Sequence, residues 1–394
     1  MKQRIDNVLI GGSLHRLTIE NGRYAAVESS GSHAHELHEA LNANDWDAQG
    51  LQFLPAFIDY HCHLDKTFVG EGWRSRKPFV TFTGQLETEK ALHATLAGTV
   101  LDRARLLAEQ MLDYGTTRVR THVDIDPVIG LRQLEDLVRL KEELKDRMEI
   151  EIVAFPQQGL LRSRSVPLIR EALRSGANLV GSVDPGGLDG QVEANLSVVY
   201  ELSSEFDADV DIHLHDFGHL GLYTVERIID YTASSAMQGR VAISHAWCLG
   251  QITADESARI AERLREQQIT IVSSVPLNRP IPNLPQLEAL GVKVRLGTDD
   301  VVNAWTPFGN GDMLERASRM AELFSLIEDD QLAGAYRFIT DAPLVPKLGE
   351  QADFVLVDAM NEQHALASVA PRELVYSRGQ AVAGRRHRRV GRLI

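Results

Sequence analysis

The chain has 394 residues, which is long for one small domain and fits a large barrel with an accessory domain. Hydrophobic residues make up 44% and charged residues 24%, the balance of a soluble globular protein. The formal net charge of −14 argues against nucleic acid as a partner, because a polyanion would be repelled.

The N-terminal segment lacks the apolar core of a secretory signal. No apolar run approaches the roughly 20 residues that are needed to cross a membrane. Cys62 and Cys248 are the two cysteines, too few for a disulfide framework. We therefore expect a cytoplasmic protein with no membrane partner. The sequence leaves open whether the chain forms a homo-oligomer.

Both ends of the chain contain short strand-like runs separated by turn signals. In residues 1–54 the pair Asn21-Gly22 indicates a tight hairpin. Residues 345–394 have the same character. We predict that the two ends meet and build a small β-sandwich domain, which leaves residues 55–344 for a second domain.

The middle of the chain alternates short β-branched runs with amphipathic segments, a pattern typical of parallel βαβ units. Eight such runs over roughly 250 residues predict an α/β fold, a closed (β/α)8 barrel of the TIM type. A doubly wound open sheet is the alternative, but no G-x-G-x-x-G or Walker-type loop supports it. The predicted strands cover residues 54–63, 116–123, 148–156, 178–184, 209–215, 241–246, 269–275 and 292–299.

Histidines and aspartates stand at the carboxyl ends of several predicted strands, the edge where barrel enzymes build their active sites. Two of these strands end in His-x-His, and alternate residues of a strand face the same side, so each pair faces the lumen. Histidines that cap strands by bonding to the backbone are the alternative. That reading does not explain why so many share one edge. These residues are His61, His63, His213, His215, Asp216, His245 and Asp299.

Imidazoles and a carboxylate that converge on one point are typical ligands of a divalent metal ion. Three imidazoles and one carboxylate leave a position open for water, whose pKa then falls towards about 7. The resulting hydroxide can attack an electrophilic carbon. A nearby acid–base group must then protonate the leaving nitrogen.

Seven segments spread from about residue 53 to 314 resemble the amidohydrolase superfamily. Within it they are most similar to the branch of bacterial cytosine deaminase and N-isopropylammelide aminohydrolase. No single segment is specific, but the set is, and the strand-rich ends fit the family as well. The segments are FIDYHCHLDKTF, VRTHVDIDP, VAFPQQG, VDPGG, DIHLHDFG, SHAWCLG and LGTDDVVNAWTPFGNGDML.

Carried over residue by residue, the resemblance implies metal ligands at His61, His63, His213 and Asp299. Binuclear members of the superfamily carry a carboxylated lysine at the end of a strand near the fourth one. The segment NLVGSVDP has no lysine there, so we predict one metal ion. We expect zinc first, with iron or manganese as alternatives that accept the same nitrogen and oxygen ligands.

The resemblance also implies substrate contacts at Gln157, Asp184 and Trp305, and a contact of His245 with the water or the substrate. Each of the first three has a structural alternative. Gln157 could bond to the backbone at its strand end, Asp184 could shape the turn before Pro185, and Trp305 could belong to the core.

The predicted acid–base group departs from the cytosine deaminase pattern, in which a glutamate follows the fifth-strand histidine by three residues. Position 216 is aspartate, one methylene shorter, and His215 stands two residues after the ligand, as in the ammelide aminohydrolase. We expect His215 to be the acid–base group, with Asp216 as the alternative. Cytosine itself is therefore in doubt as the substrate.

Residues 67–96 form a long connection after the first barrel strand, and such insertions commonly cover an active site. Trp73, Arg74, Arg76 and Lys77 are candidate specificity residues there, with a solvated surface loop as the alternative. We expect Lys66 to pair with a carboxylate such as Asp65 or to line the edge of the site, not to bridge metal ions.

The sequence therefore predicts a mononuclear metal-dependent aminohydrolase. Its substrate would be a small nitrogen heterocycle, such as a pyrimidine or triazine, that loses an exocyclic amine. Asp299 and His245 would help to move and stabilise charge. Two alternatives remain at this point: a cyclic amide or imide hydrolase on the same scaffold, and a catalytically inactive binding protein.

Overall fold

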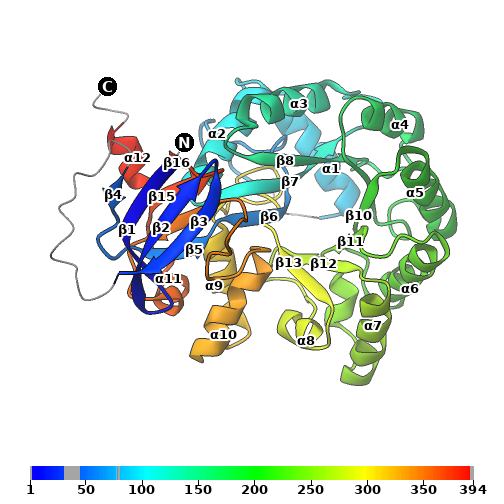
Figure 1. Cartoon of the computed structure of the whole chain (residues 1–394). Coiled ribbons are helices and arrows are strands. Elements are labelled where there is room, and N and C mark those ends of the chain that lie inside the picture. The colour runs from blue at the N-terminus through cyan, green and yellow to red at the C-terminus, as the bar shows by residue number, and fades with distance from the viewer. Residues whose placement is uncertain (1, 31–44, 77, 79, 391–394) are drawn as a thin grey trace.

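A computed structural model describes the chain at residues 2–30, 45–76, 78 and 80–390. Within these ranges the strands form two sheets of eight strands each. One is a parallel sheet from the middle of the chain, and the other combines strands from the two ends (Figure 1). Among the described helices, none is long and apolar enough to cross a membrane.

The parallel strands form a closed barrel in which neighbours follow chain order from β6 to β13. The ring closes between its first and last strands. There Cys62 pairs with Asp299 as a parallel bridge, and the Asp299 N–H donates to the His61 carbonyl at 2.7 Å. The strands are β6 (Phe57–Cys62), β7 (Thr116–Asp124), β8 (Glu149–Phe155), β9 (Leu179–Val183), β10 (Asp209–His213), β11 (Val241–Ser244), β12 (Thr270–Ser273) and β13 (Lys293–Leu296).

Helices cover the outside of the barrel (Figure 1). In α3 the buried residues Leu134, Leu137, Leu140 and Leu144 recur every three or four positions, so one apolar stripe faces the strands. This is the (β/α)8 barrel that the sequence predicted. The helices are α1 (Phe82–His93), α2 (Val100–Asp113), α3 (Arg132–Leu144), α4 (Val166–Arg174), α5 (Val192–Phe206), α6 (Gly218–Ser234), α7 (Ala254–Glu266), α8 (Leu284–Ala289), α9 (Met313–Leu323), α10 (Asp329–Gly334), α11 (Glu362–Ala367) and α12 (Arg385–Val390), with 3-10 turns η1 (Trp247–Gly250) and η2 (Ala335–Phe338).

The two chain ends share one sheet in the order β16-β15-β14-β5-β1-β2-β3, with β4 paired to β1. The ends join where β5 runs antiparallel to β14. The sheet folds over on itself, because the Tyr24 ring on β3 lies 6.0 Å from the Phe354 ring on β14 although three strands separate them. The strands are β1 (Lys2–Ile10), β2 (Ser13–Glu20), β3 (Arg23–Ser29), β4 (Trp46–Asp47), β5 (Gln52–Pro55), β14 (Phe354–Val357), β15 (Arg372–Ser377) and β16 (Gln380–Ala383).

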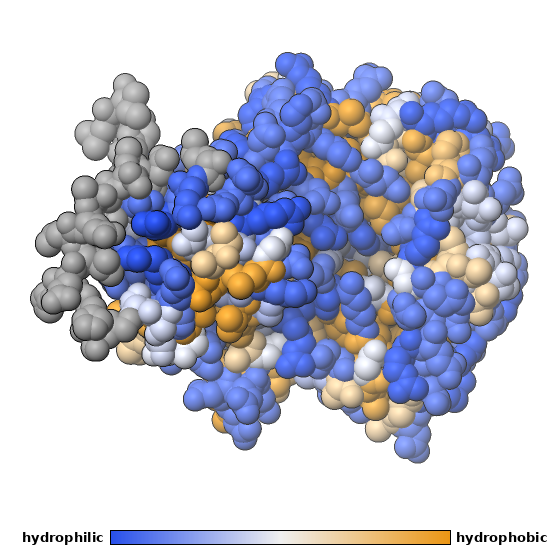
Figure 2. Space-filling view, viewed as in Figure 1, coloured by the Kyte–Doolittle hydropathy of each residue, from blue (hydrophilic) through white to orange (hydrophobic). Residues whose placement is uncertain are grey.

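Buried apolar side chains form two main cores. The larger core fills the space between the barrel strands and the surrounding helices, and a smaller one lies inside the folded-over sheet. Figure 2 shows one face of the molecular surface. Hydrophilic residues cover most of it, and hydrophobic residues appear in separate patches. The small core of the folded-over sheet fits the sandwich predicted from the two ends.

Seven of the eight barrel strands lie inside their predicted ranges, and β7 extends one residue beyond. Three predicted strands were too long at their carboxyl ends. His215, His245 and Asp299, which were placed in strands, stand in the loops that follow β10, β11 and β13. The division into one domain of residues 1–54 with 345–394 and another of 55–344 stays a prediction.

The closure of the barrel can be tested at Gly297, next to β13. A Cβ added there would meet the His61 Cβ and carbonyl oxygen at 2.5 Å, closer than real Cβ contacts. Gly297→Ala must therefore push the first and last strands apart, and we expect a loss of about 1–3 kcal/mol in the free energy of unfolding.

Thermal or denaturant unfolding measures this loss. Gly72→Ala is the matched control, because a Cβ at Gly72 meets nothing within 4 Å. Equal stability of the two variants would contradict the close packing of β6 against β13.

Candidate active site

The sequence-predicted ligands come together at the carboxyl ends of the barrel strands. His61 lies in β6 and His63 directly follows it, while His213 ends β10. His245 follows β11, and Asp299 lies three residues beyond β13. Because parallel strands end at one edge, residues far apart in the sequence reach the same space.

The donor atoms of the four predicted ligands lie at distances that suit one small cation. The Asp299 Oδ1 lies 3.4 Å from the His61 Nε2 and 3.5 Å from the His63 Nε2. The His63 Nε2 lies 3.4 Å from the His213 Nε2. Donors about 2.1 Å from a tetrahedral metal ion are separated by about 3.4 Å, so the three distances fit such a centre.

Among the described residues, three groups could each hold an ion, with ligand atoms within 4.8 Å of one another. They are His61, His63 and Asp299; His61, His213 and His245; and His61, His122 and Asp211. All three share His61, and the first two together contain all four predicted ligands. His245 is therefore close enough to compete with them, although its nearest carboxylate distance, from Nδ1 to Asp299 Oδ2, is 3.9 Å.

Burial keeps the imidazoles of His63, His213 and His245 in the form that binds metals. Burial, helped by Lys66, lowers the pKa of His63 to about 3. Burial and neighbouring imidazoles also hold the pKa values of His213 and His245 well below the usual value. Neutral imidazole is the species that ligates a cation.

Asp299 supplies the negative charge of the cluster. Burial acts to raise its pKa, but the neighbouring imidazoles of His245, His61 and His63 together lower it well below the usual value. The His61 Nε2 and both ring nitrogens of His245 are buried without a hydrogen-bond partner among the described residues. A buried carboxylate beside unpartnered ring nitrogens is a donor set that fits a divalent cation.

The backbone at two of these residues is held in an uncommon conformation. His245 has φ of +73° and Asp299 has φ of +60°, both in the left-handed region that disfavours side chains with a Cβ. Such residues persist only where the surroundings fix them, and they concentrate at functional sites. At Asp299 the backbone is held by its N–H, which donates to the His61 carbonyl of β6 at 2.7 Å.

A chain of buried hydrogen bonds orients His61. Its Nδ1 lies 2.7 Å from the Ser244 Oγ, and the Ser244 hydroxyl donates to the Asp211 Oδ1 at 2.7 Å. Asp211 is held in turn by Arg120 at 3.1 Å. A ring fixed at Nδ1 presents its Nε2 in one direction, which is how supporting groups orient metal-binding histidines.

His215 and Asp216 differ in what they face. The Asp184 Oδ2 lies 2.9 Å from the His215 Nδ1, and the His215 ring stacks on His245 with centroids 4.5 Å apart. Asp216 turns instead towards the loop after β9, where its Oδ2 accepts from the Gly187 N–H at 2.8 Å. The geometry favours His215 over Asp216 as the group beside the histidine cluster.

The environments of these two groups also differ. Burial lowers the pKa of His215, but Asp184 outweighs it and the net shift is upward. Burial and Asp184 raise the pKa of Asp216 to about 6. The predicted substrate contact of Asp184 stays a prediction, and its hydrogen bonds give it a second role in orienting His215.

Gln157 and Trp305 lie on one side of the site and share a partner that the sequence did not indicate. Glu89 in α1 accepts from the Gln157 Nε2 at 3.2 Å and from the Trp305 Nε1 at 2.8 Å. The substrate contacts predicted for Gln157 and Trp305 stay predictions. Glu89 gave no signal because it stands in a helix of the long connection after β6, not at a strand end.

The candidate specificity residues of that connection lie mainly at the surface. The Trp73 side chain is 78% exposed. Arg74 bonds to Glu71 and Thr95, and Arg76 lies over the Phe68 ring. Lys77 lies outside the described residues. The residues of this connection that reach the site are those of α1.

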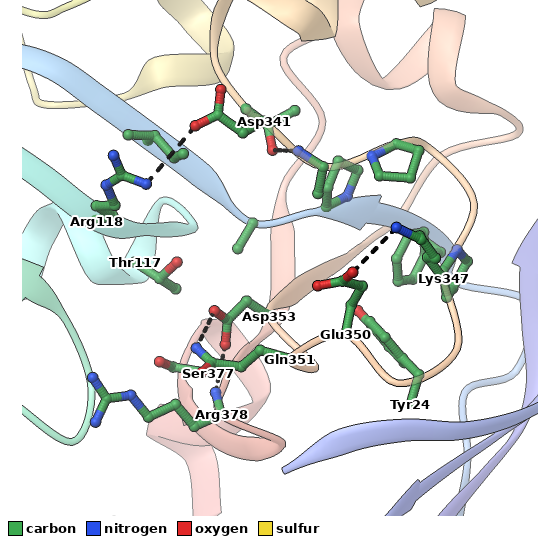
Figure 3. Close-up of a pocket in the computed structure, with 18 of the residues that line it drawn as sticks. Tyr24, Thr117, Arg118, Asp341, Lys347, Glu350, Gln351, Asp353, Ser377 and Arg378 are labelled. Atoms are coloured by element: carbon green, nitrogen blue, oxygen red, sulfur yellow. Dashed lines mark hydrogen bonds and ion pairs between the residues drawn. The ribbon is translucent and has the colours of Figure 1, made fainter. Parts of the chain in front are cut away.

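A separate cavity of about 440 Å³ lies between the barrel and the sheet of the two ends (Figure 3). Its charged residues pair with one another, as Lys347 does with Glu350 at 3.2 Å and Arg118 with Asp341 at 3.8 Å. None of the strand-end histidines lines it. The cavity is therefore distinct from the candidate active site.

Known proteins are similar to this chain in sequence and fold. The family model described as the amidohydrolase family matches residues 81–383. The uncharacterized protein YahJ of Escherichia coli (strain K12) is 35% identical over 378 residues, which cover 93% of this chain and 81% of that protein. The N-isopropylammelide isopropyl amidohydrolase of Pseudomonas sp. (strain ADP) is 32% identical over 365 residues, which cover 87% and 89%. The crystal structure of N-isopropylammelide isopropylaminohydrolase from Burkholderia multivorans ATCC 17616 matches with a TM-score of 0.87 at 33% identity, covering 97% of this chain and 98% of that one.

The barrel and its strand-end cluster define a hydrolase scaffold with a set of residues that could hold a metal ion. The chain belongs to the amidohydrolase family, since the family model spans most of it. It is an enzyme that hydrolyses C–N bonds, as the resemblance of its motifs predicted.

The orientation of His61 gives a testable prediction. Ser244→Ala removes the hydroxyl between the His61 Nδ1 and Asp211, so the ring can rotate. We expect metal affinity to fall roughly 10–100-fold with the fold intact. Competition with a chelator measures the affinity. Ser234→Ala, an exposed serine in α6, is the control, and equal affinities for the two variants would contradict the orienting role.

Proposed function

We propose that the chain is a mononuclear metal-dependent aminohydrolase. It would remove an exocyclic amine from a small nitrogen heterocycle such as a pyrimidine or triazine. The observation that carries the proposal is the convergence of the donor atoms of His61, His63, His213 and Asp299 at distances of 3.4–3.5 Å. Relatives at 32% and 33% identity are named for hydrolysis of N-isopropylammelide, which supports this class of substrate.

The four ligands would hold one divalent ion, with zinc expected first and iron or manganese as alternatives. When bound, such an ion lowers the pKa of water towards about 7 and polarises the carbon that is attacked. No lysine stands at the end of β9 to bridge a second ion. This supports a single ion.

The chain's own residues would supply the proton transfers. The Asp299 Oδ2 lies near the His245 Nδ1, and the Ser274 hydroxyl donates to it at 3.2 Å, which positions the carboxylate to accept a proton from the attacking water. His245 would stabilise the negative charge that develops on the substrate. His215 would act as an imidazolium. Its Nδ1–H would donate to Asp184, which raises the pKa of the ring against the effect of burial, and the second proton, at Nε2, would pass to the leaving amine.

Two alternatives predict different products. A cyclic amide or imide hydrolase would open the ring and release neither ammonia nor an alkylamine. A catalytically inactive binding protein would tolerate loss of His61 or His213 without loss of function. The intact set of four ligands, with donor atoms 3.4–3.5 Å apart, favours a metal centre over this second alternative.

The first test is amine release. Protein loaded with zinc, iron or manganese is incubated with aminopyrimidines, aminopurines and amino- or alkylamino-triazines, and ammonia and alkylamine are measured. We expect release from at least one ring, loss with a chelator, and recovery when the metal is restored. His61→Asn and Asp299→Asn should abolish it. Ring opening without amine release would replace this proposal with the cyclic amidase.

The acid–base group can be tested by substitution. His215→Gln removes the group that would protonate the leaving amine, and we expect kcat to fall roughly 100- to 10,000-fold while metal content is kept. Asp216→Asn should change kcat much less, because Asp216 faces Gly187. The reverse order of effects in steady-state kinetics would assign the proton transfer to Asp216.

A further inference from the structure

Helix α1 brings a carboxylate from outside the barrel to the edge of the candidate active site. The Glu89 side chain belongs to a residue that is only 4% exposed. The helix is anchored on both sides of Glu89, since the Gln85 Nε2 donates to the Ala304 carbonyl at 2.8 Å and Lys90 lies 3.4 Å from Asp126. Glu89 is therefore held in a fixed position.

Both oxygens of Glu89 accept hydrogen bonds from residues predicted to contact the substrate. Its Oε2 accepts from the Gln157 Nε2 at 3.2 Å, and its Oε1 accepts from the Trp305 Nε1 at 2.8 Å. Gln157 follows β8, whereas Trp305 lies in the loop after β13. One carboxylate therefore ties together two distant segments of the barrel edge.

Lys66 fixes the opposite end of the Gln157 amide. Its ammonium donates to the Gln157 Oε1 and lies 2.9 Å from the Asp124 Oδ1. An ammonium cannot accept a hydrogen bond, so the amide oxygen must face Lys66. The amide nitrogen then faces Glu89, to which it donates.

This arrangement decides what Gln157 can offer to a substrate. The Gln157 Nε2 donates one hydrogen to Glu89, and its other hydrogen has no acceptor among the residues that the structure describes. A substrate atom that meets this hydrogen must accept it. A ring carbonyl oxygen or an unprotonated ring nitrogen can do so, whereas a ring N–H cannot.

The charged network around Lys66 is less favourable for stability than an apolar core of the same size would be. Four carboxylates act on the single Lys66 ammonium: Asp124, Glu89, Asp65 and Asp300. Burial of several like charges around one cation costs free energy that an apolar core would avoid. That cost favours a role for the network in the reaction.

We infer that Glu89 is a positioning residue that, with Lys66, fixes Gln157 as a hydrogen-bond donor to a ring carbonyl or ring nitrogen of the substrate and sets the Trp305 indole beside it. This inference rests on the proposed function, because it specifies the substrate of the same site. Glu89 itself acts through Gln157 and Trp305.

The test is Glu89→Gln, which keeps the shape of the side chain. Its amide can still accept from Trp305 but then presents N–H groups to the N–H groups of Gln157. The kinetic pair is the best substrate of the amine-release panel and its analogue with the ring carbonyl replaced by hydrogen. We expect KM for the carbonyl substrate to rise roughly 10–100-fold, kcat to change little, and KM for the analogue to stay the same.

Three controls separate positioning from general damage. Glu87→Gln makes the same chemical change on an exposed residue of α1 and should leave KM and kcat unchanged. Metal content should be equal in all variants. In a Gln157→Ala background, Glu89→Gln should raise KM little further, because the residue it acts through is gone.

Binding measured by calorimetry does not depend on turnover. Uracil and cyanuric acid carry ring carbonyls, and we expect Glu89→Gln to weaken binding of at least one of them by the same factor as the rise in KM. Equal effects on carbonyl substrate and analogue, a fall in kcat alone, a loss of metal, or no binding of either probe to the wild-type protein would overturn the inference. Failure of the proposed function is distinct, since it shows as no amine release by the wild-type protein.

Discussion

The candidate site depends on the closure of the barrel between β6 and β13. The Asp299 N–H donates to the His61 carbonyl at 2.7 Å, which brings the last strand's carboxylate beside the first strand's imidazoles. Gly297 makes this approach possible, since any larger residue would meet the backbone of His61. Without that contact the carboxylate would be too far from His61 and His63 to share a cation with them.

Two groups of buried charged and polar side chains lie around this contact. On one side, Asp299, whose pKa is lowered, lies among the buried rings of His63, His213 and His245, whose pKa values are also lowered. On the other side, Lys66 balances several carboxylates that reach it from β7, α1 and the loops. The first arrangement could hold a metal ion, and the second holds polar side chains in fixed directions.

The barrel and the position of the histidine cluster could be predicted from the sequence, because the pattern of residues shows where each strand ends. Alternating apolar runs located the eight strands, and His-x-His at the ends of two of them placed imidazoles on one edge. The relations between loops could not be read in this way. Glu89 meets Gln157 and Trp305 only through tertiary packing of α1, and Asp184 meets His215 only because β9 and β10 are neighbours.

The sequence also missed the supporting residues that lie inside the barrel. Ser244 and Asp211 are buried polar residues of strands, a pattern that by itself suggests satisfied hydrogen bonds and no more. Their link to His61 becomes visible only when β10 and β11 are paired in register, with His213 opposite Ser244. Predicting the strands did not give the register between β10 and β11, and that register was needed to find these supporting residues.

The most direct measurement of the central claim is X-ray absorption spectroscopy at the zinc edge of protein reconstituted with zinc, together with metal analysis. The account predicts one ion per chain with nitrogen and oxygen neighbours at about 2.0–2.2 Å, several of them imidazoles, and loss of that signal in Asp299→Asn. Less than about half an equivalent of bound metal, or sulfur neighbours at about 2.3 Å, would contradict it.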